Sequence, residues 1–107
     1  MIIFRDIISS RSNPLVKWAA SLADKKGRNE EKCFLAEGEN LTFEALRRGL
    51  PVTHICVIED RADRLLNSLS EFEKDERYAK CKVTVLSESA FLKISTENHY
   101  KPEDILK

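Results

Sequence analysis

The chain has 107 residues, of which 42% are hydrophobic and 34% charged, and its acidic and basic side chains are equal in number. This length suits one domain with a single core, and the composition is that of an ordinary globular protein. No apolar run approaches the roughly 18 residues of a membrane span, and Arg5 and Asp6 interrupt the apolar start too early for a signal peptide. We therefore expect a cytoplasmic protein in which residues 1–107 form one domain.

Charge is unevenly distributed along the chain. Residues 1–32 contain seven basic and four acidic residues, whereas residues 50–79 contain four basic and seven acidic ones. Zero net charge argues against unspecific binding of nucleic acid. A basic N-terminal part is nevertheless sufficient to hold a phosphate backbone, because binding depends on the charges near it.

The cysteines and histidines give no sign of a metal site. Cys33, Cys56 and Cys81 are far apart in the sequence and odd in number, so we expect free thiols rather than disulfides or a zinc site. His54 and His99 have no second ligand at a suitable spacing. The prediction is that this chain binds no metal.

The first predicted helix begins after Asn13, a good N-cap residue, with Pro14 at the first helical position. Apolar residues at helical spacing predict its buried stripe: Leu15, Trp18, Ala19 and Leu22. Trp18 is suited to stack on a base, but this spacing favours a place in the core. Gly27 is predicted to stop the helix, and residues 25–32 to form a charged loop.

Residues 33–36 form a short apolar run, which predicts a buried strand with Phe34 in the core. The following helix is predicted over residues 40–48, with Gly49 as its stop. Its inward-facing residues are expected to be Leu41, Ala45 and Leu46.

The second half of the chain alternates strands and helices. Strands are predicted over residues 53–58 and 82–86, and a short helix after Ser87. Helical spacing predicts buried faces between and after these strands: Ala62, Leu65, Leu66, Leu69 and Phe72, then Ala90, Phe91 and Ile94. We expect residues 71–76 to be a solvated helix end and the C-terminus a polar tail. The order indicates an α/β fold, with one mixed or mostly parallel sheet flanked by helices.

Two short segments carry a family resemblance. Residues 13–17, Asn-Pro-Leu-Val-Lys, and residues 28–38, which end in Phe-Leu-Ala-Glu-Gly, resemble the N-terminal substrate-binding domain of SpoU-type (TrmH-like) RNA 2′-O-ribose methyltransferases. The resemblance covers about residues 7–98. The positions that fit the family pattern are Ser10, Asn13, Pro14, Lys17, Arg28, Phe34, Glu37, Gly38, Ala45 and Leu46.

This resemblance implies a small three-layer α/β sandwich similar to kink-turn-binding ribosomal proteins. It also implies structured ribosomal or transfer RNA as partner, and a parent protein in which a separate catalytic knot domain, absent from this chain, binds S-adenosylmethionine. This chain alone is expected to hold no cofactor, to catalyse nothing and to be monomeric.

The residues that we predict to contact RNA are Lys17, Lys25, Lys26, Arg28 and Lys32. Arg28 is the strongest candidate, since guanidinium grips a phosphate at two points or stacks on a base. Its alternatives are a solvated charge or an ion pair with Glu30 or Glu31, and Lys17 has the alternative of a solvated lysine.

Three further residues are assigned structural or orienting roles: Asn13, Glu37 and Gly38. Glu37 is expected to neutralise a neighbouring lysine or arginine, so that Glu37→Gln lowers stability modestly. The alternative is that Glu37 orients a basic residue that contacts RNA. Gly38 is expected in a tight turn with positive φ. A different class of function also stays open, a protein-interaction module without nucleic-acid binding, in which the acidic half docks a basic partner.

Overall fold

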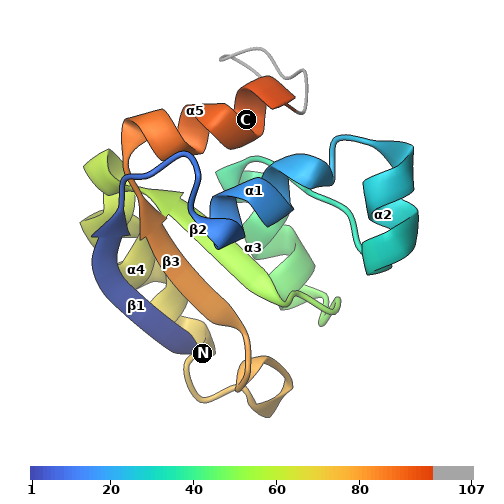
Figure 1. Cartoon of the computed structure of the whole chain (residues 1–107). Helices are drawn as coiled ribbons and strands as arrows, with labels where there is room; N and C mark the ends of the chain where they lie inside the picture. Colours follow the sequence, from blue (N-terminus) through green and yellow to red (C-terminus); the bar gives the residue numbers. More distant parts are fainter. Residues whose placement is uncertain (98–107) are drawn as a thin grey trace.

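The computed structural model describes residues 1–97, with side chains as far as residue 94, and has three layers (Figure 1). Within this part of the chain, three parallel strands form the central sheet in the order β1 (Ile2–Ile8), β3 (Lys82–Leu86), β2 (His54–Ile58). Two helices cover one face of the sheet, α1 (Pro14–Ser21) and α5 (Glu88–Glu97). Two others cover the opposite face, α3 (Glu39–Arg47) and α4 (Ala62–Leu69). The predicted α/β sandwich is confirmed, and the described sheet is entirely parallel.

The two faces of the sheet carry separate cores. The larger cluster joins the sheet to α3 and α4 and has ten buried residues: Leu46, Ile55, Val57, Leu66, Leu69, Phe72, Tyr78, Cys81, Val83 and Val85. The smaller cluster joins it to α1 and α5: Val16, Ala19, Leu86, Ala90 and Ile94. Because β3 contributes to both clusters, it is the central strand in packing as well as in pairing.

β1 is not predicted by the sequence pattern. Ile3 pairs with Val83 and Phe4 with Thr84, and the register then shifts before Ile8. The charged residues that interrupt the apolar run lie in this irregular stretch and are exposed. An edge strand tolerates such charges, whereas an inner strand does not.

The start of α1 is as predicted. The Asn13 side chain accepts a hydrogen bond from the Leu15 N–H at 2.8 Å, and Pro14 follows at the first helical position. The predicted buried stripe is wrong in part, because Leu15 and Trp18 are only half-buried. Ala19 and Leu22 are buried as predicted, and Val16 and Ala20 are buried as well, since this helix packs against α5 as well as the sheet.

The predicted charged loop over residues 25–32 is wrong, since Lys25–Glu31 form helix α2. Gly27 lies inside α2 and does not stop α1, which ends at its C-cap Leu22. A Cβ at Gly27 would overlap the carbonyl oxygen of Ser21. Glycine at this position therefore allows α2 to approach the end of α1 closely.

The predicted strand over residues 33–36 and the buried Phe34 are wrong. The segment has no regular secondary structure and lies outside the described sheet, and Phe34 is 76% exposed. Burial alternates along it from residue to residue, as in an extended chain. Successive side chains of an extended chain point to opposite sides. Leu35 takes the inward direction and packs on the smaller cluster, so Phe34 points to solvent.

The end of α3 confirms Gly49 as the predicted stop. Gly49 has φ +73° and donates to the Leu46 carbonyl at 3.2 Å, while the Leu50 N–H donates to the Ala45 carbonyl at 3.0 Å. This pair of hydrogen bonds is the Schellman motif, which suits glycine. Leu41, expected inward, is 52% exposed.

The remaining predicted elements are confirmed by β2, α4, β3 and α5. The 3-10 turns Glu59–Arg61 and Ser70–Phe72 flank α4, and a third, Glu76–Tyr78, precedes β3. The Ser87 hydroxyl accepts from the Ala90 N–H at 3.2 Å and so caps α5. The predicted polar tail after residue 98, including His99, lies outside the described residues. No helix within residues 1–97 is long and apolar enough to cross a membrane.

Candidate nucleic-acid interface

Helix α2 brings most of the predicted RNA-contacting residues together. Lys25, Lys26 and Arg28 lie in α2, and Lys32 is its C-cap with φ +59°. None of the α2 residues is buried. Lys17 is exposed on the neighbouring helix α1. The chain therefore presents four basic residues on seven helical residues and their cap, which we term the α2 surface.

Arg28 is held by backbone rather than by a carboxylate. Its Nη1 donates to the carbonyl oxygens of Leu22 and Ala23, at 3.0 and 2.7 Å. These carbonyls lie just after α1, where the helix dipole favours a cation. Arg28 is half-buried, and it fastens α2 to the end of α1. Neither of the predicted ion pairs with Glu30 and Glu31 forms among the described residues.

The lysines of the α2 surface are nearly free of ion pairs. Lys26 Nζ lies 4.0 Å from a carboxylate oxygen of Glu30, and both side chains are well exposed. Exposed pairs of this kind contribute at most about 1 kcal/mol. Lys26 therefore stays available to a phosphate.

We predict that Arg28→Ala lowers the stability of the domain by about 1–2 kcal/mol, because two carbonyls lose a charge-assisted hydrogen bond. Amide hydrogen exchange should show the largest loss of protection in α2, which has no buried residue to hold it. A thermal melt and an exchange profile equal to those of the wild type would contradict this anchoring role. The matched control is Lys25→Ala, an exposed change in the same helix, which should melt like the wild type.

Gly38 forms the turn before α3, with φ +116° and ψ +140°. Its carbonyl oxygen accepts from the N–H and the hydroxyl of Thr42, at 3.0 and 2.9 Å. The predicted positive φ is confirmed. Asn13 likewise has its predicted structural role, as the cap of α1.

Glu37 has an unexpected environment. Both carboxylate oxygens are shielded from solvent, and they have no hydrogen-bond partner among the described residues. Burial raises the pKa of Glu37 above its ordinary value of 4.5. The expected ion pair with a lysine or arginine is not seen in this part of the chain, and nothing here shows Glu37 orienting a basic side chain.

This environment reverses the expected effect of Glu37→Gln. A carboxyl with a raised pKa binds a proton in the folded state at pH values where the unfolded chain has released it. Stability therefore falls as the pH rises above 4.5 and through the raised pKa, and the loss persists at higher pH. We predict that Glu37→Gln stabilises the domain at pH 7 and that the difference vanishes at low pH. Urea titrations at pH 7 and at about pH 4 test this, and a less stable variant at pH 7 would refute it.

The structure also brings together two side chains that lie far apart in the sequence. The rings of Trp18 and His54 lie 4.7 Å apart with planes tilted by 52°. Burial, and then the nearby Lys82 cation, lower the pKa of His54. Short-range spacing carries no signal of this contact, because it joins α1 to β2. Within the described residues, no cluster of side chains is suited to hold a metal ion.

The family follows from a comparison with known proteins. The sequence matches the model of the MRM3-like substrate binding domain over residues 13–106. The chain belongs to this family. The match confirms the resemblance to the N-terminal substrate-binding domain of a SpoU-type RNA methyltransferase. It indicates a substrate-binding role in an RNA methyltransferase, and with that role RNA binding.

The matched range contains α1, α2 and both predicted family segments, whereas β1 precedes it. No curated protein and no solved structure matches the sequence significantly.

Proposed function

We propose that this MRM3-like domain binds structured ribosomal or transfer RNA through the α2 surface and presents it to a SpoU/TrmH-type catalytic knot domain, which methylates a ribose 2′-hydroxyl. The observation that carries the proposal is the α2 surface itself. Lys25, Lys26 and Lys32 are exposed there, and Arg28 is held between them by backbone carbonyls.

Lysine and arginine on a short, solvated helix suit contact with phosphates rather than with base edges. Phosphate contacts position a protein on RNA without reading its sequence, and A-form RNA is recognised largely by its shape and backbone. Such a domain would orient a folded RNA, while another part of the protein selects the nucleotide.

We propose that the methyl donor, S-adenosylmethionine, is held by the catalytic domain and not by this chain. Nucleotide-binding loops depend on glycine for close approach of the backbone. The three glycines of this chain do not form such a loop. Gly27 lies inside α2, Gly38 in the turn before α3 and Gly49 in the turn after it. The proposed role of this chain is to bind and orient RNA.

Fluorescence anisotropy with a labelled transfer RNA and a ribosomal RNA hairpin, over a range of salt concentrations, tests the proposal. The double variant Lys25→Gln/Lys26→Gln should bind several-fold more weakly, and the slope of log K against log salt should become shallower by about 1.5. The control Lys74→Gln/Lys80→Gln removes the same charge from exposed positions outside α2 and should bind like the wild type.

Undetectable binding at low salt, or an affinity that does not fall with salt, would overturn RNA binding by this chain. Affinity equal to the wild type in the α2 double variant would remove the α2 surface from the interface. A protein partner retained after nuclease treatment, together with undetectable RNA binding, would favour the protein-interaction module instead.

A further inference from the structure

At the N-terminal ends of the strands, some side chains on the sheet face that carries α1 and α5 are exposed to solvent. The strand register aligns Ile2, Lys82 and His54 across β1, β3 and β2. Because paired residues point to the same face of a sheet, these three side chains share one face. Their neighbours Val83 and Ile55 pack in the cluster on the α3 and α4 side, so the row faces the other way.

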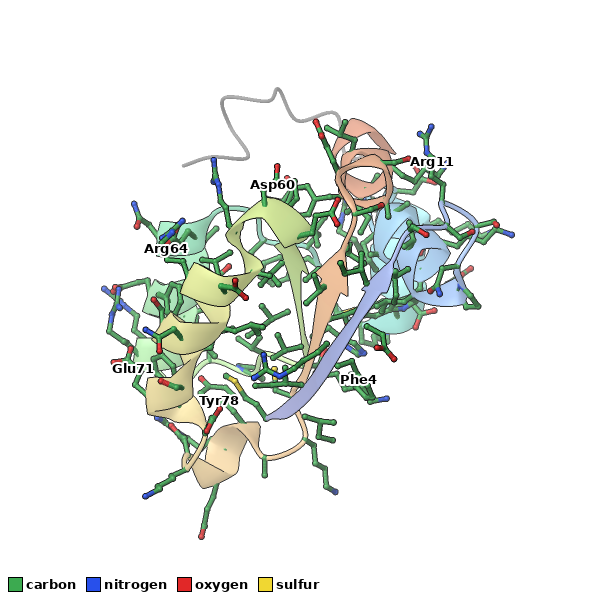
Figure 2. All side chains as sticks on the ribbon, turned by 90° about the vertical axis from the view of Figure 1, so that its left-hand side faces the viewer. Phe4, Arg11, Asp60, Arg64, Glu71 and Tyr78 are labelled. Atoms are coloured by element: carbon green, nitrogen blue, oxygen red, sulfur yellow. The ribbon has the colours of Figure 1, made fainter. Side chains whose placement is uncertain are left out.

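Phe4 extends this open face by one row. It pairs with Thr84, two residues after the first row, and thus points to the same side. Figure 2 places Phe4 on the side of the sheet that carries α1, below the helices. Phe4 is 47% and Ile2 43% exposed. The helices therefore leave Ile2, Phe4 and Lys82 exposed at this end of the face, whereas Thr84, the partner of Phe4 on β3, is buried.

At the β2 end of the same face, Trp18 of α1 contacts His54. Lys82 is exposed on the central strand, and its positive charge contributes to the lowered pKa of His54. Neighbouring strands lie about 5 Å apart. Phe4 and the Trp18–His54 pair are therefore two strand spacings apart across the sheet and one row apart along it, and Lys82 lies in the row of His54 on the strand between them. We term Phe4, Trp18, His54 and Lys82 the aromatic face.

We propose that the aromatic face stacks unpaired bases of single-stranded RNA, in addition to the backbone contacts of the α2 surface; this inference rests on the proposed RNA-binding function. Single-stranded RNA is bound by open sheet faces on which aromatic rings stack bases while cations meet the phosphates. An apolar partner would leave the Lys82 charge buried without a counter-ion in its own row, since the residues aligned with Lys82, Ile2 and His54, are not acidic. RNA supplies both the ring and the negative charge.

The chain contains a built-in reporter, because Trp18 is its only tryptophan. A single-stranded oligoribonucleotide of about ten nucleotides should quench the Trp18 fluorescence, and the same sequence annealed into a duplex should not. Phe4→Leu keeps an apolar side chain but removes the ring, and it should weaken single-strand binding about fivefold or more. Phe4→Tyr keeps the ring and should bind like the wild type.

Lys82→Gln should also weaken single-strand binding, whereas Lys74→Gln, an exposed control outside this face, should not. If transfer RNA binds but the single strand leaves Trp18 unchanged and Phe4→Leu binds normally, this inference is overturned and the proposed function stands. If no RNA binds at all, both fail. If Phe4→Leu changes only the sedimentation of the protein and not its RNA affinity, the face contacts protein and the inference is again overturned.

Discussion

Tyr78→Ala is expected to destabilise this domain by about 4 kcal/mol, the range found when a buried aromatic side chain is truncated. Tyr78→Phe, which removes only the hydroxyl, is expected to cost about 1–2 kcal/mol. Tyr78 is 1% exposed and belongs to the larger core cluster. Its ring is nearly perpendicular to that of Phe72, with the ring centroids 6.4 Å apart.

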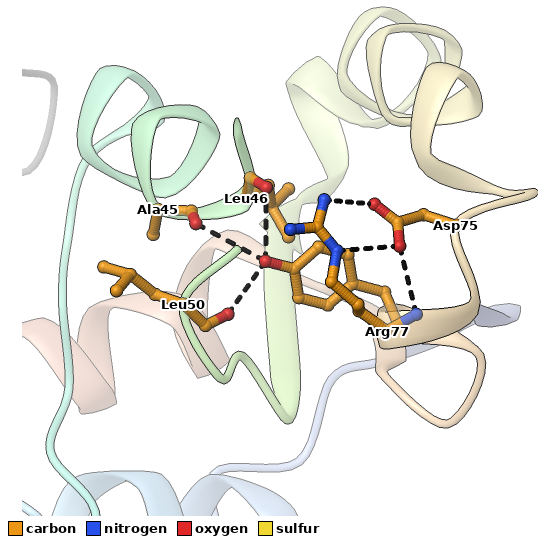
Figure 3. A network of polar contacts seen from close by, with 6 residues as sticks. Ala45, Leu46, Leu50, Asp75 and Arg77 are labelled. Carbon is orange, nitrogen blue, oxygen red and sulfur yellow. Dashed lines mark hydrogen bonds and ion pairs between the residues drawn. The ribbon is translucent and has the colours of Figure 1, made fainter. Parts of the chain in front are cut away.

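The hydroxyl of Tyr78 contacts backbone carbonyls at the end of α3, and Figure 3 labels the three residues that carry them, Ala45, Leu46 and Leu50. It lies 2.8 Å from the Leu50 carbonyl oxygen, 3.2 Å from that of Leu46 and 3.4 Å from that of Ala45. The hydroxyl has one hydrogen to donate, and the Leu46 and Ala45 carbonyls already accept from the Gly49 and Leu50 N–H groups. The Leu50 carbonyl therefore depends most on Tyr78, and Tyr78→Phe leaves it without this donor.

Urea titration of both Tyr78 variants measures these losses. The matched control is Arg77→Gln, which removes the exposed pair with Asp75 and the cation 5.6 Å from the Tyr78 ring centre; it should cost no more than about 1 kcal/mol. A Tyr78→Phe variant as stable as the wild type would mean that the Leu50 carbonyl finds another donor, and would refute the role given to the hydroxyl.

Gly38→Ala is expected to destabilise the domain by about 2 kcal/mol. With φ +116° and ψ +140°, Gly38 occupies a backbone region that residues with a Cβ avoid. The strain reaches α3 directly, because the Gly38 carbonyl receives the first helical hydrogen bond of that helix. Alanine must either keep this conformation at a cost or shift the start of α3.

The measurement for Gly38→Ala is a thermal melt with an RNA titration well below the melting temperature. The control Asn40→Ala lies exposed in the first turn of α3 and should change stability by no more than about 0.5 kcal/mol. Gly49 offers a second comparison, because its φ of +73° lies in the left-handed region that asparagine also adopts. A Cβ at Gly49 would overlap Nη1 of Arg77, so Gly49→Asn is made in the Arg77→Gln variant. There Gly49→Asn should be milder than Gly38→Ala, and the opposite order would contradict the role of φ.

The sequence by itself determined the elements that depend on local signals. Asn13, Gly49 and Ser87 mark helix ends correctly, because capping involves backbone groups only a few residues away. β2 and β3 are recognisable as short, nearly continuous apolar runs, and α4 by its regular spacing. The positive φ of Gly38 and the clustering of basic residues in α2 could also be predicted, since both depend on residue type and on neighbours along the chain. RNA contact by those basic residues stays a prediction.

Only the tertiary structure decided what each side chain meets. Phe34 has the composition of a core residue, yet the alternation of an extended segment gives the inward place to Leu35. Arg28 is recognisable as a free cation, but only the return of α2 onto α1 brings it to the carbonyls of Leu22 and Ala23. Tyr78 stands in a charged stretch, and its contact with Leu50 spans 28 residues. The Tyr78 contact depends on packing between distant segments, and the Arg28 contact on the turn between two helices. Short-range periodicity and capping carry no signal for either.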